Sequence, residues 1–223
     1  MMKRLSGFTV AEVLVTLGLV GVVAALTLPA LNSSIRGQQI GPAFAKAVNT
    51  LENGNKLLMN ENEVRKLSDI EADNYLDALS STVNLTSAPS GVEYTAFTGS
   101  TTVFTSPATS YQTGDGVAYY LSGGLTNGGS TEGAYMGSYY TLYIDINGPA
   151  TSPNAMGRDL FKVYVDTSGT VIPHGGSAYA SYMPSGSSEW ASDCKGKTVG
   201  GSPAGVSCAG SIADNNWKAV YKL

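Results

Sequence analysis

The sequence predicts an α+β fold in which one long N-terminal α-helix packs on an antiparallel β-sheet. The helix is predicted from an apolar stretch at residues 8–31 that continues as an amphipathic stripe to about residue 63. The sheet is predicted from short alternating segments, separated by turn signals, between residues 117 and 173. Laying the sheet on the amphipathic half of the helix is the economical way to bury both apolar faces.

The apolar stretch is long enough to cross a membrane. Its 24 residues would form a helix about 36 Å long, against a hydrocarbon core of about 30 Å. Lys3 and Arg4 precede the stretch, and no basic residue follows until Arg36. The positive-inside rule therefore keeps the N-terminus in the cytoplasm and sends the rest of the chain outward. A secretory signal peptide is disfavoured, because the small residue Gly7 stands before the apolar stretch and not after it.

The residues around Gly7 resemble the leader and N-terminal helix of the type IV pilin and type II secretion pseudopilin superfamily. The resemblance rests on Lys-Arg-Leu-Ser-Gly7, on Phe8-Thr-Val-Ala-Glu12 and on Pro29. It implies that a prepilin peptidase cuts after Gly7, that Phe8 is then methylated on its new amine, and that Glu12 assists assembly. The chain would divide into a leader at residues 1–7, a transmembrane and assembly helix at residues 8–31, and a pilin-like domain at residues 32–223.

Glu12 has a physical interpretation of its own. A carboxylate within a membrane span is expensive and usually faces a partner. No Lys, Arg or His lies between residues 8 and 31, so the only nearby cation would be a new α-amine at Phe8, one helical turn away on the same face. That amine could belong to the same chain or to a neighbouring subunit. The alternative is an uncleaved anchor that holds Glu12 in the headgroup zone.

Several residues are expected to interrupt the long helix. Glycine lowers helix propensity by about 1 kcal/mol, and an interior proline costs about 3 kcal/mol. Gly18, Gly21 and Pro29 therefore make the membrane half weakest between residues 18 and 29, where the resemblance implies unwinding in a filament; tolerance of Gly and Pro by membrane helices is the alternative. Pro42 predicts a second bend.

Beyond Pro29 the helical pattern continues as an amphipathic stripe. Asn53, Asn55 and Lys56 are expected off the stripe or at its margin. A capping box from Ser68 to Glu71 predicts a short helix that extends to about Ser80. The residues of the stripe and of the inward face of the short helix are, in order, Ile40, Phe44, Ala47, Val48, Leu51 and Leu58, then Ile70, Leu76 and Leu79.

The second half of the chain is predicted as a loop followed by a sheet. Residues 83–113 are rich in Ser and Thr and read as a long variable loop with short extended pieces at 93–97 and 101–105. Better strands follow at 117–121, 139–146, 160–165 and 170–173, the last two joined as a hairpin. Residues 123–133 read as a flexible connection.

Cys194 and Cys208 are the only cysteines and predict a disulfide in an exported chain. Closing a loop of about 15 residues contributes about 3 kcal/mol in the chain-entropy view. The resemblance implies that this loop, residues 194–208, is an exposed variable region. Trp217 is expected to anchor a terminal strand, with Ala219 and Tyr221 on the same face.

Other candidate sites are weak. Asp145, Asn147 and Asp159 gather oxygen ligands between two strands, but their spacing departs from the calcium-binding EF-hand loop, and turns in which Asn and Asp bond their own backbone are the favoured interpretation. His174, the only histidine, is expected in a solvated turn. No pattern of a catalytic nucleophile with its base accompanies it, so the chain is not expected to be an enzyme and no cofactor is expected, calcium aside.

Charge and composition narrow the function. The net charge is −4, and loss of the leader would leave 11 basic and 17 acidic side chains. An acidic surface gives no support for nonspecific binding to phosphate backbones, and no specific nucleic-acid partner is predicted. Together with the resemblance, this predicts a structural subunit of a type IV pilus or pilus-like filament: a homo-oligomer held in the bacterial inner membrane, cleaved by prepilin peptidase and assembled by an inner-membrane platform into an extracellular filament or a periplasmic pseudopilus. A pseudopilin of a type II secretion system, a minor pilin or adhesin, and an uncleaved surface anchor are the alternatives.

Overall fold

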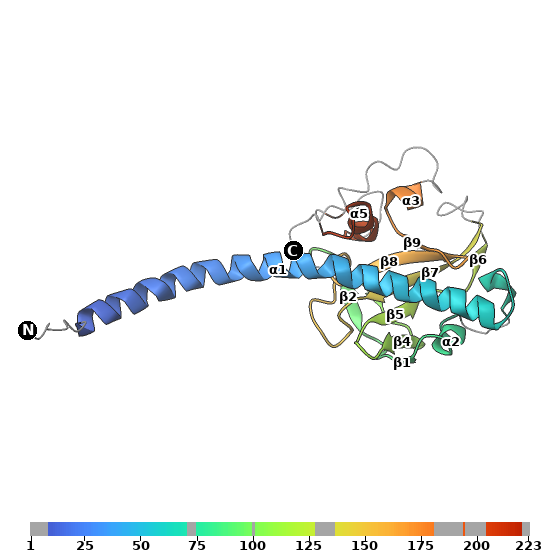
Figure 1. Ribbon diagram of the computed structural model, residues 1–223, viewed down its shortest axis with the longest axis horizontal. Helices are drawn as coiled ribbons and strands as arrows, with labels where there is room; N and C mark the ends of the chain where they lie inside the picture. The colour runs from blue at the N-terminus through green and yellow to red at the C-terminus, as the bar shows by residue number, and fades with distance from the viewer. Residues whose placement is uncertain are drawn as a thin grey trace, which may run out of the picture.

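The computed structural model describes residues 9–70, 75–99, 101–127, 137–180, 194 and 204–219. One long helix, α1, projects from the domain with its first half and lies along the domain with its second half (Figure 1). The chain is α+β, as predicted. The predicted leader, Phe8, Glu71 and Tyr221 lie outside the described residues, as do nine residues of the predicted disulfide loop, 195–203.

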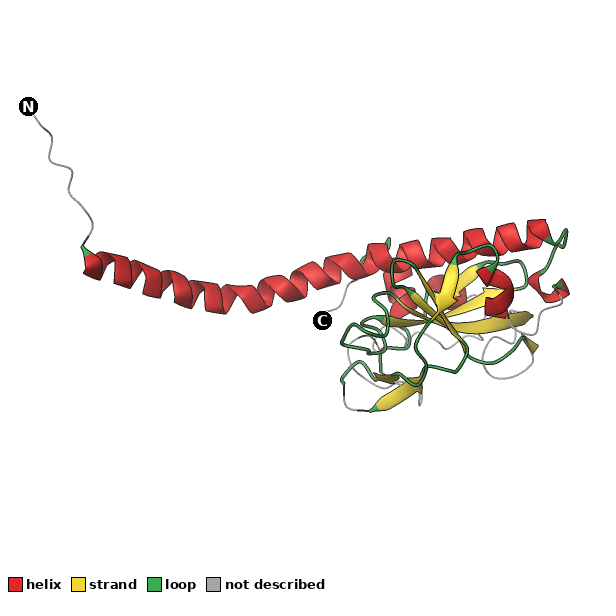
Figure 2. Cartoon of the chain, turned by 90° about the horizontal axis from the view of Figure 1, so that it is seen from below, coloured by secondary structure: helices red, strands yellow, loops and turns green. Residues whose placement is uncertain are grey.

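Helix α1 runs from Val10 to Glu61 without interruption. It curves smoothly and shows no break at Gly18, Gly21, Pro29 or Pro42 (Figure 2). The predicted bend at Pro42 is therefore wrong for this state of the chain. A proline removes one backbone hydrogen bond, and in a helix of this length the bonds on either side, together with the packing of the following turns, keep the axis continuous. Unwinding within a filament concerns another state and stays a prediction.

The main sheet is antiparallel throughout. Six strands lie in the order β1-β4-β5-β7-β8-β9, and β6 pairs with the start of β7. The four segments predicted between residues 117 and 173 are all strands of this sheet. The strands are β1 Leu85–Ser87, β4 Ser110–Thr113, β5 Ala118–Leu121, β6 Thr126–Asn127, β7 Ser138–Asp145, β8 Leu160–Asp166 and β9 Val171–Pro173.

The segment 83–113 is more ordered than its composition predicts. Its extended pieces form the hairpin β2 (Glu93–Thr95) and β3 (Thr102–Thr105), close to the predicted positions. However, β1 and β4 were missed, and both belong to the main sheet. β1 is three residues long and β4 four, and both carry little apolar alternation. Pairing of β1 with β4, and of β4 with β5, therefore stabilises them more than their local sequence does.

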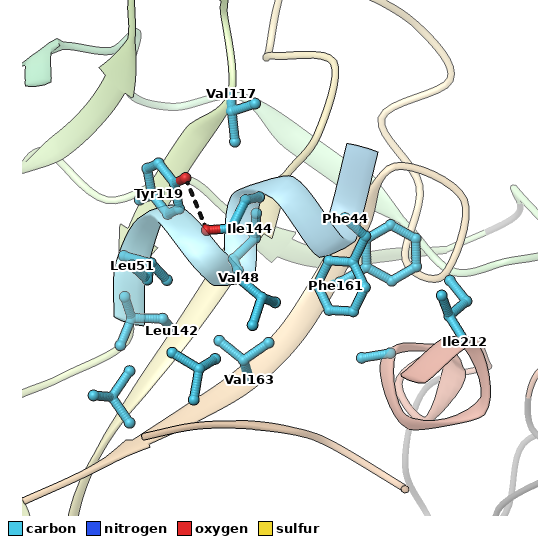
Figure 3. Close-up of a cluster of buried hydrophobic side chains, with 14 of the residues drawn as sticks. Phe44, Val48, Leu51, Val117, Tyr119, Leu142, Ile144, Phe161, Val163 and Ile212 are labelled. Atoms are coloured by element: carbon cyan, nitrogen blue, oxygen red, sulfur yellow. Dashed lines mark hydrogen bonds between the residues drawn. The ribbon is translucent and has the colours of Figure 1, made fainter. Parts of the chain in front are cut away.

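The core lies between the second half of α1 and one face of the main sheet. All six residues of the predicted stripe are buried, and the Phe44 ring packs on Phe161 with centroids 4.7 Å apart. The hydroxyl of Tyr119 donates to the backbone carbonyl of Ala47, 3.3 Å away. Figure 3 shows the stripe of α1 facing alternate residues of the strands. The sheet residues on this face include Tyr119, Leu142, Ile144, Phe161, Val163 and Val165.

The opposite face of the sheet is also covered. Tyr94 from β2 and Tyr120 from β5 are buried together with Leu160, beneath the β2–β3 hairpin. Tyr139 and Tyr164 are buried further along the same face. Both faces of the sheet are therefore covered. Successive residues along β5, β7 and β8 point alternately into the core beneath α1 and into the clusters on the opposite face.

The segment between α1 and the sheet differs from its predicted start. A 3₁₀-helix at Leu67–Asp69 and the helix α2 at Tyr75–Ser80 replace one capped helix. The Ser68 hydroxyl donates to the Asp69 carboxylate. Leu67 is buried in the core, and its N–H donates to the carbonyl of Thr167 at 2.8 Å. Leu76 and Leu79 are buried as predicted.

Asn55 is a core residue, which corrects the prediction that it lies outside the stripe. It is fully buried on α1, beneath the β8–β9 hairpin. Its side-chain amide donates to the carbonyl of Gly169 at 3.0 Å, and its carbonyl oxygen accepts the hydroxyl of Tyr75. One side chain thus ties α1 to α2 and to the hairpin turn.

Replacing Asn55 should destabilise the domain strongly. In Asn55→Ala the Gly169 carbonyl and the Tyr75 hydroxyl lose their partner in a buried place, which predicts a loss of about 2–3 kcal/mol in the free energy of unfolding. Denaturant unfolding of the full chain in detergent micelles measures it. Asn53→Ala, at an exposed position of the same helix, is the control and should change stability little. Equal effects of the two substitutions would contradict the bridging role of Asn55.

Candidate functional site

The first half of α1 is an exposed apolar surface. The 18 residues Val10–Thr27 are long and apolar enough to cross a membrane, and none of them is buried in the domain. Val10 and Leu26, near its two ends, are 77% and 75% exposed. A surface of this kind marks a contact with lipid or with another protein. The large exposed side chains are Val10, Val13, Leu14, Val15, Leu17, Leu19, Val20, Val22, Val23 and Leu26.

Glu12 lies at the start of this surface and caps its own helix. The N–H and the hydroxyl of Thr9 donate to Oε2 of Glu12 at 2.9 and 3.0 Å, and the N–H of Glu12 donates back to the Thr9 hydroxyl at 3.2 Å. This reciprocal capping box satisfies two N–H groups that a helix start leaves unpaired. Its signal, Thr-x-x-Glu before an apolar run, is present in the sequence and could have predicted it.

The capping box changes what the acid needs from a partner. The carboxylate accepts two hydrogen bonds and lies at the positive end of the helix dipole, so the chain itself supplies part of its stabilisation. Within the described residues the one ion pair joins Lys46 and Asp115, so Glu12 takes part in none. Phe8, the predicted source of a compensating amine, lies outside the described residues.

The predicted oxygen cluster is built into turns. Asp145 accepts the Tyr94 hydroxyl at 2.6 Å and the N–H groups of Asn147 and Gly148 at 3.2 and 2.9 Å. Asp159 accepts the N–H groups of Asn154 and Ala155, both at 2.7 Å. Burial raises the pKa of Asp145 to about 7, against the effect of these bonds. The described residues contain no group of three acidic, His or Cys side chains that could hold a metal.

The side chain of Asn147 completes this arrangement, since its amide donates to the carbonyl of Thr151 at 3.2 Å. All three candidate residues are thus engaged with nearby backbone, as the turn interpretation predicted. These hydrogen bonds hold the loop between β7 and β8 in one conformation.

His174 is buried, and the prediction of a solvated turn is wrong. It is 1% exposed, and its Nδ1 lies 2.8 Å from the Tyr164 hydroxyl. The rings of Tyr164 and Tyr179 stack beside it with centroids 5.1 Å apart. Burial lowers the pKa of His174 well below its ordinary value, and the charge of Lys162 adds to the effect. The turn is covered because the C-terminal helix α5 (Cys208–Asp214) packs on it, with the N–H of Gly210 donating to the carbonyl of His174 at 2.8 Å.

Cys194 and Cys208 form the predicted disulfide, with Cα atoms 5.0 Å apart. Both are buried. Cys208 begins α5, and its sulfur lies against the backbone of Gly157, where a Cβ would come within 2.7 Å of it. The bond therefore joins residue 194 to the start of α5, and Cys208 packs against the loop between β7 and β8.

Trp217 does not begin a strand. Residues 217–219 have no strand partner, and Trp217 has a φ of 58°. Its ring instead packs on Phe44 of α1, with centroids 5.7 Å apart. The partly buried side chain of Trp217 thus packs on the helix and not on the sheet, which the alternation of Trp217, Ala219 and Tyr221 did not reveal.

No protein-family model, no curated protein and no solved structure matches this chain. The interpretation of the site therefore depends on its own geometry.

The buried His174 predicts acid sensitivity. Its pKa is depressed in the folded state, so below the ordinary value of 6.5 the unfolded chain takes up a proton that the folded domain does not, and stability falls as the pH drops. From about pH 6.5 to about pH 5, the unfolding free energy of His174→Gln should rise relative to that of the wild type as the pH falls. Asp145 has a raised pKa and acts in the opposite direction, so the comparison of the two proteins at each pH isolates His174. Parallel curves would show that His174 is not kept neutral by the fold.

Proposed function

We propose that this protein is a structural subunit of a type IV pilus-like filament, stored in a membrane and assembled through the apolar half of α1. The observation that supports this most is that ten large apolar side chains of one helix lie exposed while the other half of the same helix forms the core of the domain. Burial of each such side chain is worth about 1.5–3 kcal/mol, so this half requires a hydrocarbon or protein surrounding.

Two surroundings fit the helix in turn. Before assembly the lipid bilayer would cover it, because its length and composition suit a membrane span. In a filament, the same helices of neighbouring copies would cover one another. The leader-like residues ahead of Phe8, the capped Glu12 and the pilin-like arrangement of a helix on an antiparallel sheet support this order of events. A pseudopilin of a secretion system would share these features and differ in where its filament ends.

Processing is the direct test. Intact-mass analysis of the assembled protein should show a chain that begins at Phe8 and carries one methyl group on its amine. Gly7→Ala should slow cleavage much less than a bulky or charged replacement. Residues 1–7 still attached in filaments would contradict the proposal and favour an uncleaved anchor.

Substitutions at Glu12 should separate its charge from its capping role. Glutamine also serves in a capping box, so Glu12→Gln should keep the helix start and lose the charge, whereas Glu12→Val should lose both. We expect both variants to insert into the membrane as well as or better than the wild type and to form fewer filaments. Filament yield by shearing and immunoblot, against membrane-bound subunit, measures the effect. An unchanged yield in both variants would reject a role for the charge in assembly.

Thr9→Val is the matched control for capping alone, since it removes the hydroxyl that accepts the Glu12 N–H and keeps the carboxylate. Its filament yield should fall less than that of Glu12→Gln if the charge is what assembly requires. A loss larger than that of Glu12→Gln would assign the role to the capped helix start.

A further inference from the structure

A short C-terminal segment crosses α1 where its apolar half leaves the domain. We define residues 216–219 as the C-terminal latch. The carbonyl oxygen of Trp217 lies against Gly41 so closely that a Cβ on Gly41 would collide with it. The Trp217 ring packs edge-on against Phe44, one turn further along α1.

The latch contacts α1 on both sides of Pro42, at Gly41 and at Phe44. Pro42 follows Gly41 directly, has no N–H to donate and is exposed. Sequence alone predicts a bend here, yet α1 is continuous. The backbone of the latch packs on Gly41 and the Trp217 ring packs on Phe44, so these contacts lie on either side of Pro42. They add tertiary packing at the point where the helix lacks one backbone hydrogen bond.

The latch is itself held in a strained form. Asn216 and Trp217 have φ values of 54° and 58°, in the left-handed region that a bulky residue such as Trp rarely adopts. The N–H of Trp217 donates to the carbonyl of Ile212 at 3.0 Å, and with the ring on Phe44 this contact keeps the conformation. A short, partly exposed and strained terminal segment can open without unfolding the domain.

We propose that the C-terminal latch is a brace for the joint at Gly41 and Pro42. When the latch is closed, α1 stays continuous across this joint, and when it opens, the apolar half can swing relative to the domain. The use of such a hinge, to reorient the domain between membrane and filament, rests on the proposed function. The brace itself does not, because it is a property of a single chain.

The test measures the angle between the two halves of α1 in the monomer. Spin labels are attached at Leu26→Cys and Ser87→Cys, both at exposed positions. Pulsed electron paramagnetic resonance in detergent micelles then measures the distance from the apolar half of α1 to the domain. The wild-type latch should give one narrow distance distribution. Trp217→Ala should broaden and shift it. Adding Pro42→Ala to Trp217→Ala should narrow it again, because alanine restores the missing N–H.

Phe104→Ala is the matched control. It removes a partly buried aromatic ring that packs on Tyr143 on the opposite face of the sheet, away from α1, and should leave the distribution narrow. Circular dichroism of each variant checks the fold, and a chain that ends at Asn215 serves as the second latch variant.

A narrow distribution in Trp217→Ala and in the shortened chain would overturn the brace, as would a broad distribution that Pro42→Ala does not narrow. Loss of the domain's circular dichroism in both latch variants would overturn it as well, since the latch would then be part of the core. None of these outcomes depends on filament formation, so a failure of the proposed function would be seen separately, as a wild-type chain that yields no filaments.

Discussion

The packing of α1 on the inner face of the sheet is the interaction on which the rest of the structure depends. The stripe of α1 that includes Phe44 and Leu51 covers the inner side of β5, β7 and β8. Because α1 continues unbroken from Val10 to Glu61, the direction of the exposed apolar half is set by how the other half seats on the sheet. Any change that loosens the core is therefore expected to redirect the apolar half as well.

Burial and satisfied polar groups, more than charge, hold this arrangement together. Charged residues make up only 13% of the chain, and the Lys46–Asp115 pair between α1 and the β4–β5 turn is exposed, so it contributes little. The buried polar groups act differently. Asn55 joins three elements and Asp145 fixes a loop through three donors, so each specifies one relative placement that apolar packing alone would leave less defined.

Local sequence patterns predicted the elements that form from their own periodicity. They failed where contact with a residue distant in sequence decides whether a side chain is buried. The helical period placed the stripe of α1, and alternation placed β7 and β8. Asn55 and His174 are polar residues in unremarkable surroundings, and their burial is set by a hairpin turn 114 residues away and by the C-terminal helix α5. The bend expected at Pro42 is also absent, and a segment distant in sequence, around residue 217, packs on Gly41 beside it. The Thr9 capping box, by contrast, follows a recognisable sequence pattern. The similar pattern at Ser68 wrongly predicts the start of an α-helix, because Ser68 lies within a 3₁₀-helix.

The capped and the paired interpretations of Glu12 are compatible. Both bonds from Thr9 end on Oε2, and a carboxylate has about four acceptor positions, so Oε1 is not used by the cap. The side chain lies on the exposed half of α1, where a donor from another chain can approach. The cap would then do two things at once: it lowers the cost of holding the acid near the membrane, and it fixes the direction in which the second oxygen faces. Within a proposed filament, a positive group on a neighbouring subunit would meet an oriented acceptor and not a freely rotating one, which would favour a single register between copies.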